Sequence, residues 1–337
     1  MIYDITLIPG DGIGPSIMDM AVRVLEASGV RFAWDRQLAG MAAVDRVGTP
    51  MPDETVASIR NTRIAFKGPL TTPVGGGFRS VNVLLRQEFN LYANVRPAVS
   101  LPGVAAARKG VDIVTVRENT EGLYSGIEHY IRVEGETVAA ESIAVVTRKS
   151  SENIIRYAFE YARRNNRRKV TLVHKANILK CTTGLFLETG RTIAESFPEI
   201  RFEDRIIDAC AMELVMRPEA FDVIVTTNLF GDILSDLTAG LIGGLGLTAG
   251  ANIGRDTAIF EAVHGSAPDI AEKNIANPTA VILSGAMMLD HLGEPAAAEN
   301  VRKAVHGVIA EGKRVTPDLG GSATTAEMGE AVIEKLR

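Results

Sequence analysis

The sequence predicts an α/β protein, because short apolar segments rich in Val, Ile and Phe alternate along the chain with longer amphipathic segments. With 337 residues the chain is long enough for two domains with substantial hydrophobic cores. Hydrophobic residues make up 46% and charged residues 23% of the chain, as in ordinary globular proteins. This composition excludes a largely disordered chain, a collagen-like chain and a small disulfide scaffold.

The apolar segments predict buried strands, and the amphipathic segments between them predict helices. The expected strands are residues 5–9, 63–67, 111–117, 170–174 and 221–227. The expected helices are residues 17–27, 152–165 and 184–196. Residues 126–146 alternate as β-strands do, which predicts an arm or hairpin outside the main sheet. The glycine-rich residues 237–254 predict a buried turn region rather than a membrane span.

Charge and cysteine content narrow the environment and the partners. The net charge of −5 comes from 36 basic and 41 acidic residues. It gives no electrostatic reason to expect nucleic acid or an anionic membrane as a partner. Cys181 and Cys210 are too few for a disulfide framework and fit a reducing cytosol. The first residues contain no segment of signal-peptide type, so we expect a soluble, cytoplasmic protein.

Residues 9–15 read Pro-Gly-Asp-Gly-Ile-Gly-Pro and look at first like a dinucleotide-binding loop. The dinucleotide fingerprint is G-x-G-x-x-G, whose third glycine lets a helix and a strand pack closely. Counted from Gly10, that third position is Pro15. The fingerprint therefore fails, and the loop predicts a tight turn before a helix.

Two acidic residues follow a predicted strand and enter a predicted helix. Asp232 and Asp236 are four residues apart, so their Cβ atoms lie on one helix face about 5–6 Å apart. Acidic residues are common in the first turns of solvated helices, where the helix dipole favours them. Here the apolar neighbours Ile233, Leu234 and Leu237 indicate a mostly buried helix instead. Two buried anions on one face need a positive partner.

Asp208 is a third candidate ligand, because it follows an apolar segment at a predicted strand end. Three carboxylates without a Cys/His cluster indicate a hard divalent cation, Mg²⁺ or Mn²⁺, rather than zinc. The sequence does not choose between these two ions.

Three arginines border apolar segments, and burying an unpaired guanidinium is costly. They are Arg86, Arg96 and Arg117. For one such arginine, an internal ion pair with a nearby carboxylate is the ordinary explanation. Three together indicate a shared ligand with several carboxylates, which guanidinium groups bind in a bidentate manner.

A lysine and a tyrosine are candidates for proton transfer. Lys175 closes a predicted strand, and ligands of α/β proteins bind outside such strand ends. A lysine beside a divalent cation can have a lowered pKa and act as a base. Tyr124 could act as the matching acid. Taken singly, a surface lysine and a half-buried tyrosine are the commoner explanations.

Six segments together match one known pattern. They are GPLTTPVGGGFRSVNVLLRQEFNLYANVRP, VRENTEGLYSGIEH, VHKANI, NLFGDILSDL, GGLGL and FEAVHGSAPDIAEKNIANP. The pattern resembles the metal-dependent β-decarboxylating dehydrogenases, the isocitrate/3-isopropylmalate dehydrogenase family. The resemblance covers essentially the whole chain.

The resemblance implies the non-Rossmann α/β fold of this family, with two domains and a central cleft. Residues 1–96 and 254–337 would form a large, discontinuous domain on the cofactor side. Residues 97–253 would form a smaller domain with the metal ligands and the dimer contacts, including the arm near residues 126–146. The active site would lie in the cleft of a homodimer.

The resemblance also assigns roles residue by residue. Arg86, Arg96, Arg117 and Tyr124 would bind the carboxylates of the substrate. Asp232 and Asp236 would bind the metal ion in their own subunit. Lys175 and Asp208 would complete the site of the partner subunit, with Lys175 as a substrate-binding and catalytic residue. Tyr124 is the other expected catalytic residue.

Two residues favour isocitrate as the substrate. Ser80, Asn82 and Arg86 form the S-x-N-x-x-x-R pattern that resembles isocitrate dehydrogenases. A hydroxyl and an amide can donate hydrogen bonds to the third carboxylate of isocitrate. The expected reaction is oxidative decarboxylation of D-isocitrate to 2-oxoglutarate and CO₂. Homoisocitrate or 3-isopropylmalate as substrate remains an alternative, as does a non-catalytic regulatory subunit of a hetero-oligomeric isocitrate dehydrogenase.

The resemblance further implies NAD⁺ as the cofactor. Asp269 and Ile270 stand where NADP-preferring bacterial relatives carry Lys-Tyr. An aspartate can accept hydrogen bonds from the adenosine ribose but repels a 2′-phosphate. His264 and Asn277 would line the adenine pocket. The other expected cofactor-binding residues are Leu70, Thr72, Glu261, Gly265, Ser266 and Ala267.

Overall fold

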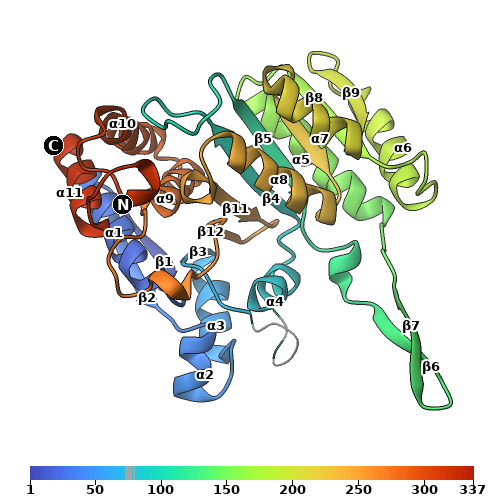
Figure 1. Cartoon of the computed structure of the whole chain (residues 1–337), viewed down its shortest axis with the longest axis horizontal. Helices are drawn as coiled ribbons and strands as arrows, with labels where there is room; N and C mark the ends of the chain where they lie inside the picture. Colours follow the sequence, from blue (N-terminus) through green and yellow to red (C-terminus); the bar gives the residue numbers. More distant parts are fainter. Residues whose placement is uncertain (73–77, 79) are drawn as a thin grey trace.

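A ten-stranded mixed sheet forms the centre of the computed structural model, which describes residues 1–72, 78 and 80–337 (Figure 1). In spatial order the strands are β2 (Arg31–Arg36), β1 (Ile2–Ile8), β3 (Ile64–Lys67), β12 (Ala258–Ala262), β11 (Ala249–Ile253), β4 (Ala93–Val99), β5 (Asp112–Glu118), β10 (Val223–Thr226), β8 (Lys169–His174) and β9 (Arg201–Ile206). The first four and the last four strands each run parallel to one another. Between these groups β11 and β4 pair in antiparallel fashion with each other and with their neighbours.

Helices cover both faces of the sheet. On one face, α3 (Asp53–Thr62) packs on β1 and β3, α8 (Asn228–Leu241) packs on β5 and β4, and α7 (Ile207–Met216) packs beside α8. On the reverse face, α9 (Thr279–His291) packs on β11 and β12, and α5 (Arg148–Arg164) packs on β5, β8 and β10. The helices beside these on the reverse face are α1 (Gly14–Ala27), α6 (Thr182–Ala194), α10 (Pro295–Glu311) and α11 (Thr325–Leu336).

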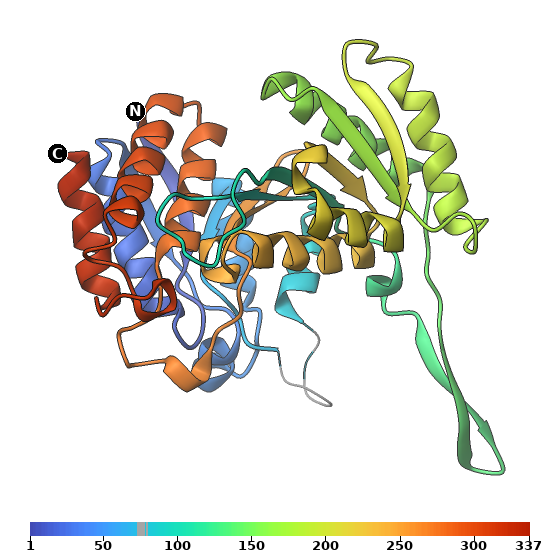
Figure 2. The ribbon, with the colours of Figure 1, turned by 45° about the horizontal axis from the view of Figure 1, so that its top comes forward.

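The remaining elements are short or stand apart from the main sheet. They are α2 (Met41–Val47), α4 (Val81–Glu88), the 3₁₀ turns η1 (Leu123–Ser125), η2 (Pro218–Ala220), η3 (Leu245–Leu247), η4 (Pro268–Ile270) and η5 (Pro317–Leu319), and the hairpin of β6 (Glu128–Val133) and β7 (Glu136–Ser142). Figure 2 shows this hairpin projecting away from the body of the molecule. No helix in the described part of the chain is long and apolar enough to cross a bilayer.

The predicted α/β class, the five strands, the three helices and the arm are all present, with ends shifted by a few residues. The prediction of a turn region for residues 237–254 is wrong in part, because β11 lies within it at the centre of the sheet. Its residues are small, and three of the five are Ala or Gly, so neither apolar periodicity nor bulk marks a strand there. Strands β2, β4 and β12 were not predicted either, and of β9 only the end before Asp208 was expected.

The two predicted domains share the one sheet. The boundary between residues 1–96 with 254–337 and residues 97–253 falls between β12 and β11 and passes through β4. The division into domains stays a prediction.

The glycine loop before α1 is a tight turn, as predicted, and its glycines allow three segments to touch. Gly10 has φ +82°, and a Cβ atom on it would lie 2.3 Å from the carbonyl oxygen of Pro69. A Cβ atom on Gly12 would lie 2.1 Å from the carbonyl oxygen of Ser266. The backbone N–H groups of Asp11 and Ile13 donate to these same two carbonyls at 2.8 and 2.9 Å. The loop therefore holds the segments around residues 69 and 266 together.

Asp11 adds a buried carboxylate to this junction. It accepts hydrogen bonds from the backbone N–H groups of Met41 at 3.1 Å and Ala42 at 3.0 Å, at the start of α2. It also accepts from the backbone N–H of Thr71 at 2.8 Å. The N-terminus of a helix leaves its first N–H groups without partners and favours a negative charge. Asp11 satisfies both needs and ties α2 to residue 71.

We expect Asp11→Ala to lower the free energy of unfolding by about 3 kcal/mol, because hydrogen bonds to a charged group contribute about 1.5–3 kcal/mol each and do not add fully. Asp53→Ala is the matched control, since Asp53 is exposed in the first turn of α3 without a side-chain cap. Its effect should stay below about 1 kcal/mol. Urea unfolding of both variants at one protein concentration makes the comparison, and equal stability would contradict the role given to Asp11.

Candidate active site

Arg117, near the end of β5, lies under α8 with only 1% of its surface exposed. Its Nε donates to the backbone oxygen of Asn228 at 2.9 Å, and its Nη1 donates to Asp232 at 2.5 Å. The guanidinium lies 5.1 Å from the centre of the Tyr124 ring. A Cβ atom on Gly231 would lie 2.5 Å from Cγ of Arg117. The buried arginine therefore requires the glycine at position 231.

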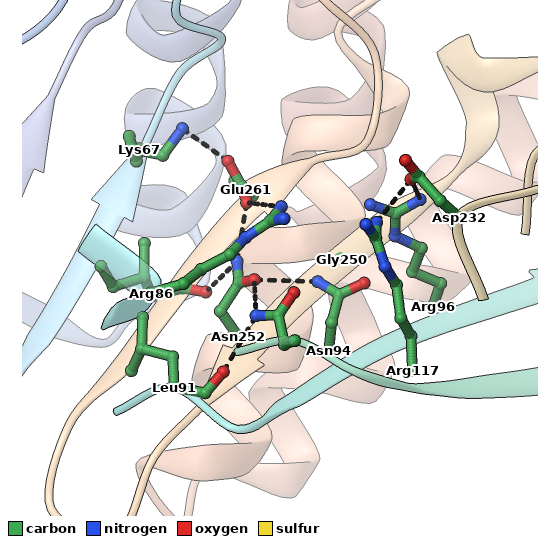
Figure 3. Close-up of polar contacts among 12 residues, drawn as sticks. Lys67, Arg86, Leu91, Asn94, Arg96, Arg117, Asp232, Gly250, Asn252 and Glu261 are labelled. Atoms are coloured by element: carbon green, nitrogen blue, oxygen red, sulfur yellow. Dashed lines mark hydrogen bonds and ion pairs between the residues drawn. The ribbon is translucent and has the colours of Figure 1, made fainter. Parts of the chain in front are cut away.

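Arg96, on the neighbouring strand β4, reaches the same helix. Its Nη1 donates to Oγ of Ser235 at 2.6 Å and to Oδ1 of Asp232 at 3.3 Å. Oδ1 of Asp236, one helical turn further, lies 3.7 Å away. Asp232 thus pairs with two buried guanidinium groups at once (Figure 3).

α4 brings the third predicted arginine to the same face. Nη2 of Arg86 lies 3.8 Å from Oε1 of Glu261. The Nε atoms of Arg86 and Arg96 are buried and make no hydrogen bond to another described residue. Oδ1 of Asn82, one turn earlier on α4, is also buried without a partner in the described residues. Buried polar atoms without partners are costly, so these atoms indicate the place of a polar ligand.

The three arginines lie close enough to repel one another. Burial lowers the pKa of Arg96, and the charge of Arg86 lowers it further. Burial, with Arg96 and then Arg86, lowers the pKa of Arg117 to about 9. Lowered guanidinium pKa values mean that the protein's own carboxylates do not compensate the positive charge. An anion with several carboxylates would complete this site, as predicted from the sequence.

Lys67, which sequence analysis missed, is the fourth buried cation of the site. Its Nζ lies 2.5 Å from Oε2 of Glu261, whose Oε1 accepts from Asn252 at 2.6 Å (Figure 3). Burial alone would raise the pKa of Glu261, but Lys67 and Arg86 hold it at about 2. Glu261 was expected to bind the cofactor, and within this chain it pairs with these two cations. The sequence signal for Lys67 was its position as the last residue of the apolar segment 63–67.

Tyr124 lies in η1, beside α8, and its hydroxyl donates to Oδ2 of Asp232. Burial and this hydrogen bond raise the pKa of Tyr124, so the hydroxyl keeps its proton at neutral pH. Burial would raise the pKa of Asp232, but Arg117, the Tyr124 hydroxyl and Arg96 hold it below its usual value. The predicted acid and the predicted metal ligand are therefore in direct contact.

Asp236 pairs less closely with the buried arginines than Asp232 does. Burial raises the pKa of Asp236, Arg96 opposes this shift, and the neighbouring charge of Asp232 adds to it. A cation between these two carboxylates would offset both the burial of Asp236 and its repulsion by Asp232. Carboxylate oxygens suit a hard ion. Only one face of α8 is buried, because Leu234 is fully buried while Ile233 is 54% exposed. The expectation of a mostly buried helix is wrong for that face.

The third predicted ligand lies elsewhere. Asp208, in the first turn of α7, is exposed and pairs with Lys175 at 2.5 Å between Oδ1 and Nζ. This hydrogen bond to Lys175 lowers the pKa of Asp208. Among the residues that the structure describes, no three His, Cys, Asp or Glu side chains lie close enough together to hold a metal ion. Asp208 and Lys175 thus form a pair of their own, and their place in a partner's site stays a prediction.

A cavity of about 530 Å³ lies beside the glycine loop and gathers half of the predicted cofactor residues. Its lining includes Ile13, His264, Gly265, Ala267, Ile270, Asn277 and Asp318. Nε2 of His264 is buried without a partner among the described residues, which fits a ligand in this cavity. Burial lowers the pKa of His264, so the ring is neutral at pH 7. The Asn277 amide already donates to Asp318 at 2.9 Å.

The other predicted cofactor and substrate residues lie around the arginine cluster and the cavity beside the glycine loop. Ser266 is buried and shares a 2.7 Å hydrogen bond with the hydroxyl of Thr71, next to the exposed Thr72 and the buried Leu70. Asp269 is exposed in η4 and does not line the cavity. Ser80 directly precedes α4 and is partly exposed.

The fold and the cluster of buried arginines define an α/β protein with a cationic site suited to a small polyanion. Residues 4–332 match the family described as isocitrate/isopropylmalate dehydrogenase, and the chain belongs to this family. The resemblance and the non-Rossmann fold predicted from the sequence are thereby confirmed. The chain is accordingly an oxidoreductase of this family.

Individual relatives agree with the family. A solved structure described as isocitrate dehydrogenase from Methylococcus capsulatus is 69% identical, with a TM-score of 0.97 and 99% of each chain covered. Isocitrate dehydrogenase (NAD) catalytic subunit 5, mitochondrial, of Arabidopsis thaliana is 50% identical over 332 residues, which are 98% of this chain and 88% of the relative. Isocitrate/homoisocitrate dehydrogenase of Thermus thermophilus is 53% identical over 341 residues, which are 100% and 99% of the two chains.

The pH dependence of the stability of the Glu261→Gln variant tests the ion pair between Glu261 and Lys67. The Glu261 pKa is about 2 in the fold against an ordinary 4.5, so its stabilisation is present above pH 4.5 and is lost as the pH falls towards 2. A difference of this size corresponds to about 3 kcal/mol. The free energy of unfolding of the wild type should exceed that of Glu261→Gln by about this amount at pH 7. Urea titrations should show the difference vanishing near pH 2, and a pH-independent difference would contradict the assignment.

Proposed function

We propose that this chain catalyses the oxidative decarboxylation of D-isocitrate to 2-oxoglutarate and CO₂ with reduction of NAD⁺. The observation that carries the proposal is the excess of buried positive charge at Arg86, Arg96 and Arg117, where the Nε atoms of Arg86 and Arg96 have no partner among the described residues. Isocitrate has three carboxylates, and guanidinium groups bind carboxylates through paired hydrogen bonds. The names of the relatives support the same substrate.

Asn82 and Ser80 would select isocitrate within the family. Asn82 and Arg86 are four residues apart on α4 and share a helix face, so both would contact one end of the substrate. The Nδ2 group of Asn82 would donate to the third carboxylate and would lose this partner with an apolar substituent in its place. Homoisocitrate remains the second candidate, because the relative from Thermus thermophilus carries both names.

Asp232 and Asp236 would hold a Mg²⁺ or Mn²⁺ ion together with Asp208 of the partner subunit. The bound ion would lower the pKa of the substrate hydroxyl. Lys175 of the partner subunit would accept the hydroxyl proton as hydride passes to NAD⁺. After CO₂ leaves, Tyr124 would donate its proton to the C3 carbon, which its raised pKa and position beside Asp232 support.

The cavity beside the glycine loop would take the adenosine end of NAD⁺. Its volume of about 530 Å³ suits part of a dinucleotide, and His264 and Ile270 line it. Asp269 next to Ile270 would accept hydrogen bonds from the ribose and repel a 2′-phosphate. NAD⁺ is therefore the expected cofactor rather than NADP⁺, in agreement with the relative from Arabidopsis thaliana.

A homodimer would bring the separated parts of the site together. Several exposed apolar residues of the described chain lie on α7, α8 and the hairpin. They include Met212, Val215, Met216, Ile233, Tyr130, Val133 and Val138. Exposed apolar surface of this kind is typical of a subunit interface. We propose a cytoplasmic homodimer, with Lys175 and Asp208 of each subunit facing the partner's Asp232 and Asp236.

Initial rates of NADH formation at 340 nm test the function. D-isocitrate, homoisocitrate and 3-isopropylmalate should each be offered with NAD⁺ or NADP⁺ and with Mg²⁺ or EDTA. We expect turnover of isocitrate with NAD⁺ that EDTA abolishes. Turnover of only another substrate would overturn the roles of Ser80 and Asn82. Inactivity of the purified chain with all three would favour the regulatory-subunit alternative.

Tyr124→Phe should lower kcat with isocitrate by about 10²–10⁴-fold, the usual effect of losing a general acid. KM should change less than kcat, because the three arginines still bind the substrate carboxylates. Tyr3→Phe, on β1 where the hydroxyl donates to Glu294, is the matched control and should leave kcat unchanged. Full activity of Tyr124→Phe would remove the acid role.

A further inference from the structure

A second cavity, of about 590 Å³, lies on the reverse face of the sheet. Its floor is formed by apolar residues of the central strands, among them Val95 and Pro97 of β4, Ala251 of β11 and Phe260 of β12. One wall is α5, and the other is formed by α9 and α10. The family resemblance and the proposed reaction give this cavity, which we call the reverse cleft, no role.

The α5 wall is aromatic. Tyr157 and Tyr161 stack with ring centres 6.4 Å apart, and both line the cleft. Neither hydroxyl makes a hydrogen bond to another residue in the described part of the chain. Leu283 and Met287 of α9 line the opposite side. A flat apolar group could therefore lie between aromatic and aliphatic surfaces, with two hydroxyl groups nearby.

Among the charged groups that line the cleft in the described chain, one cation makes no ion pair. Arg302 pairs with Asp290, and Arg167 pairs with Asp112 and Asp222. Arg164 is exposed, its Nε donates to the backbone oxygen of Glu160 at 3.3 Å, and its guanidinium lies 5.8 Å from the centre of the Tyr157 ring without an ion pair to a described carboxylate. Its charge reaches across the cleft, because burial and then Arg164 lower the pKa of His291 on α9. The cleft therefore offers one uncompensated positive charge beside an apolar floor.

We propose that the reverse cleft binds a planar aromatic monocarboxylate, with the ring on the apolar floor and the carboxylate on Arg164. The volume lies in the usual range for small-ligand sites. A single free cation suits one carboxylate, whereas the three arginines of the opposite face suit a polyanion. A planar aromatic ring matches the stacked tyrosines and loses little conformational entropy on binding.

Strand geometry connects the two faces. Side chains alternate between faces along a strand, so Val95 and Pro97 of the cleft floor flank Arg96 of the active site. Ala251 and Phe260 likewise directly precede Asn252 and Glu261. A ligand in the reverse cleft would press on the strands that position the substrate arginines. It would therefore change the KM for isocitrate. This change in KM rests on the proposed function, whereas binding of the ligand to the reverse cleft does not.

Isothermal titration calorimetry with 2-naphthoate tests the site, on protein saturated with NAD⁺ so that the cofactor cavity is filled. We expect one binding site per chain. Arg164→Gln should weaken binding about tenfold, which corresponds to about 1.4 kcal/mol. Arg163→Gln is the matched control, because Arg163 is on the same helix but lies over Phe197, 5.3 Å from its ring centre. The neutral 2-naphthalenemethanol should bind the wild type as weakly as 2-naphthoate binds Arg164→Gln.

Equal binding of 2-naphthoate to the wild type and Arg164→Gln would overturn the proposal, as would loss of binding in the presence of NAD⁺. Met287→Trp, which fills the cleft from a partly exposed position, should abolish binding and provides an independent check. In kinetic assays 2-naphthoate should shift the isocitrate KM of the wild type and not that of Met287→Trp. Arg164-dependent binding without such a shift would overturn the coupling between the faces. Absence of isocitrate turnover would contradict only the proposed function.

Discussion

The burial of four cationic groups at the centre of one sheet is the constraint on which the rest of the site depends. Lys67, Arg86, Arg96 and Arg117 all lie on the face that α8 and α4 border, and two carboxylates, Asp232 and Glu261, provide most of their compensation. Buried charges without partners cost several kcal/mol each. The fold can hold this cluster because it spreads the cations over four elements, β3, α4, β4 and β5, and an anionic ligand would complete the compensation.

Several local features hold these cations in place. Gly231 lacks the Cβ atom that would collide with Arg117, and Asn228 binds the same guanidinium through both its backbone and its side chain. Asn252 connects Glu261 to Asn94 and Asn119 through three hydrogen bonds. Such a network fixes side-chain directions before the ligand arrives, which lowers the entropic cost of binding.

The sequence allowed the arginines and the paired aspartates to be recognised, because each stands beside an apolar segment that must be buried, whereas the role of Tyr124 came mainly from the family resemblance. It could not identify their partners. Asp232 was expected to bind a metal ion, and only the packing of α8 on β5 and β4 brings it against Arg96, Arg117 and Tyr124. Lys67 was missed because a lysine at a strand end is usually exposed. Strand β11 was missed because its small residues carry no period, and only its neighbours β12 and β4 define it.

The central strands also explain why one sheet can carry two different sites. On one face α3 packs on β1 and β3 and α8 packs on β4 and β5, so that β12 and β11 lie between these helices. On the other face the reverse cleft lies between α5 and α9. Alternation sends Asn94 and Arg96 to one face and Val95 and Pro97 to the other. The small residues of β11 add to this difference, since Ala251 leaves room in the reverse cleft while Asn252 fills the polar face. A change of side chain at Ala251 or Asn252 would therefore shift the backbone that the two residues share and affect the sites on both faces.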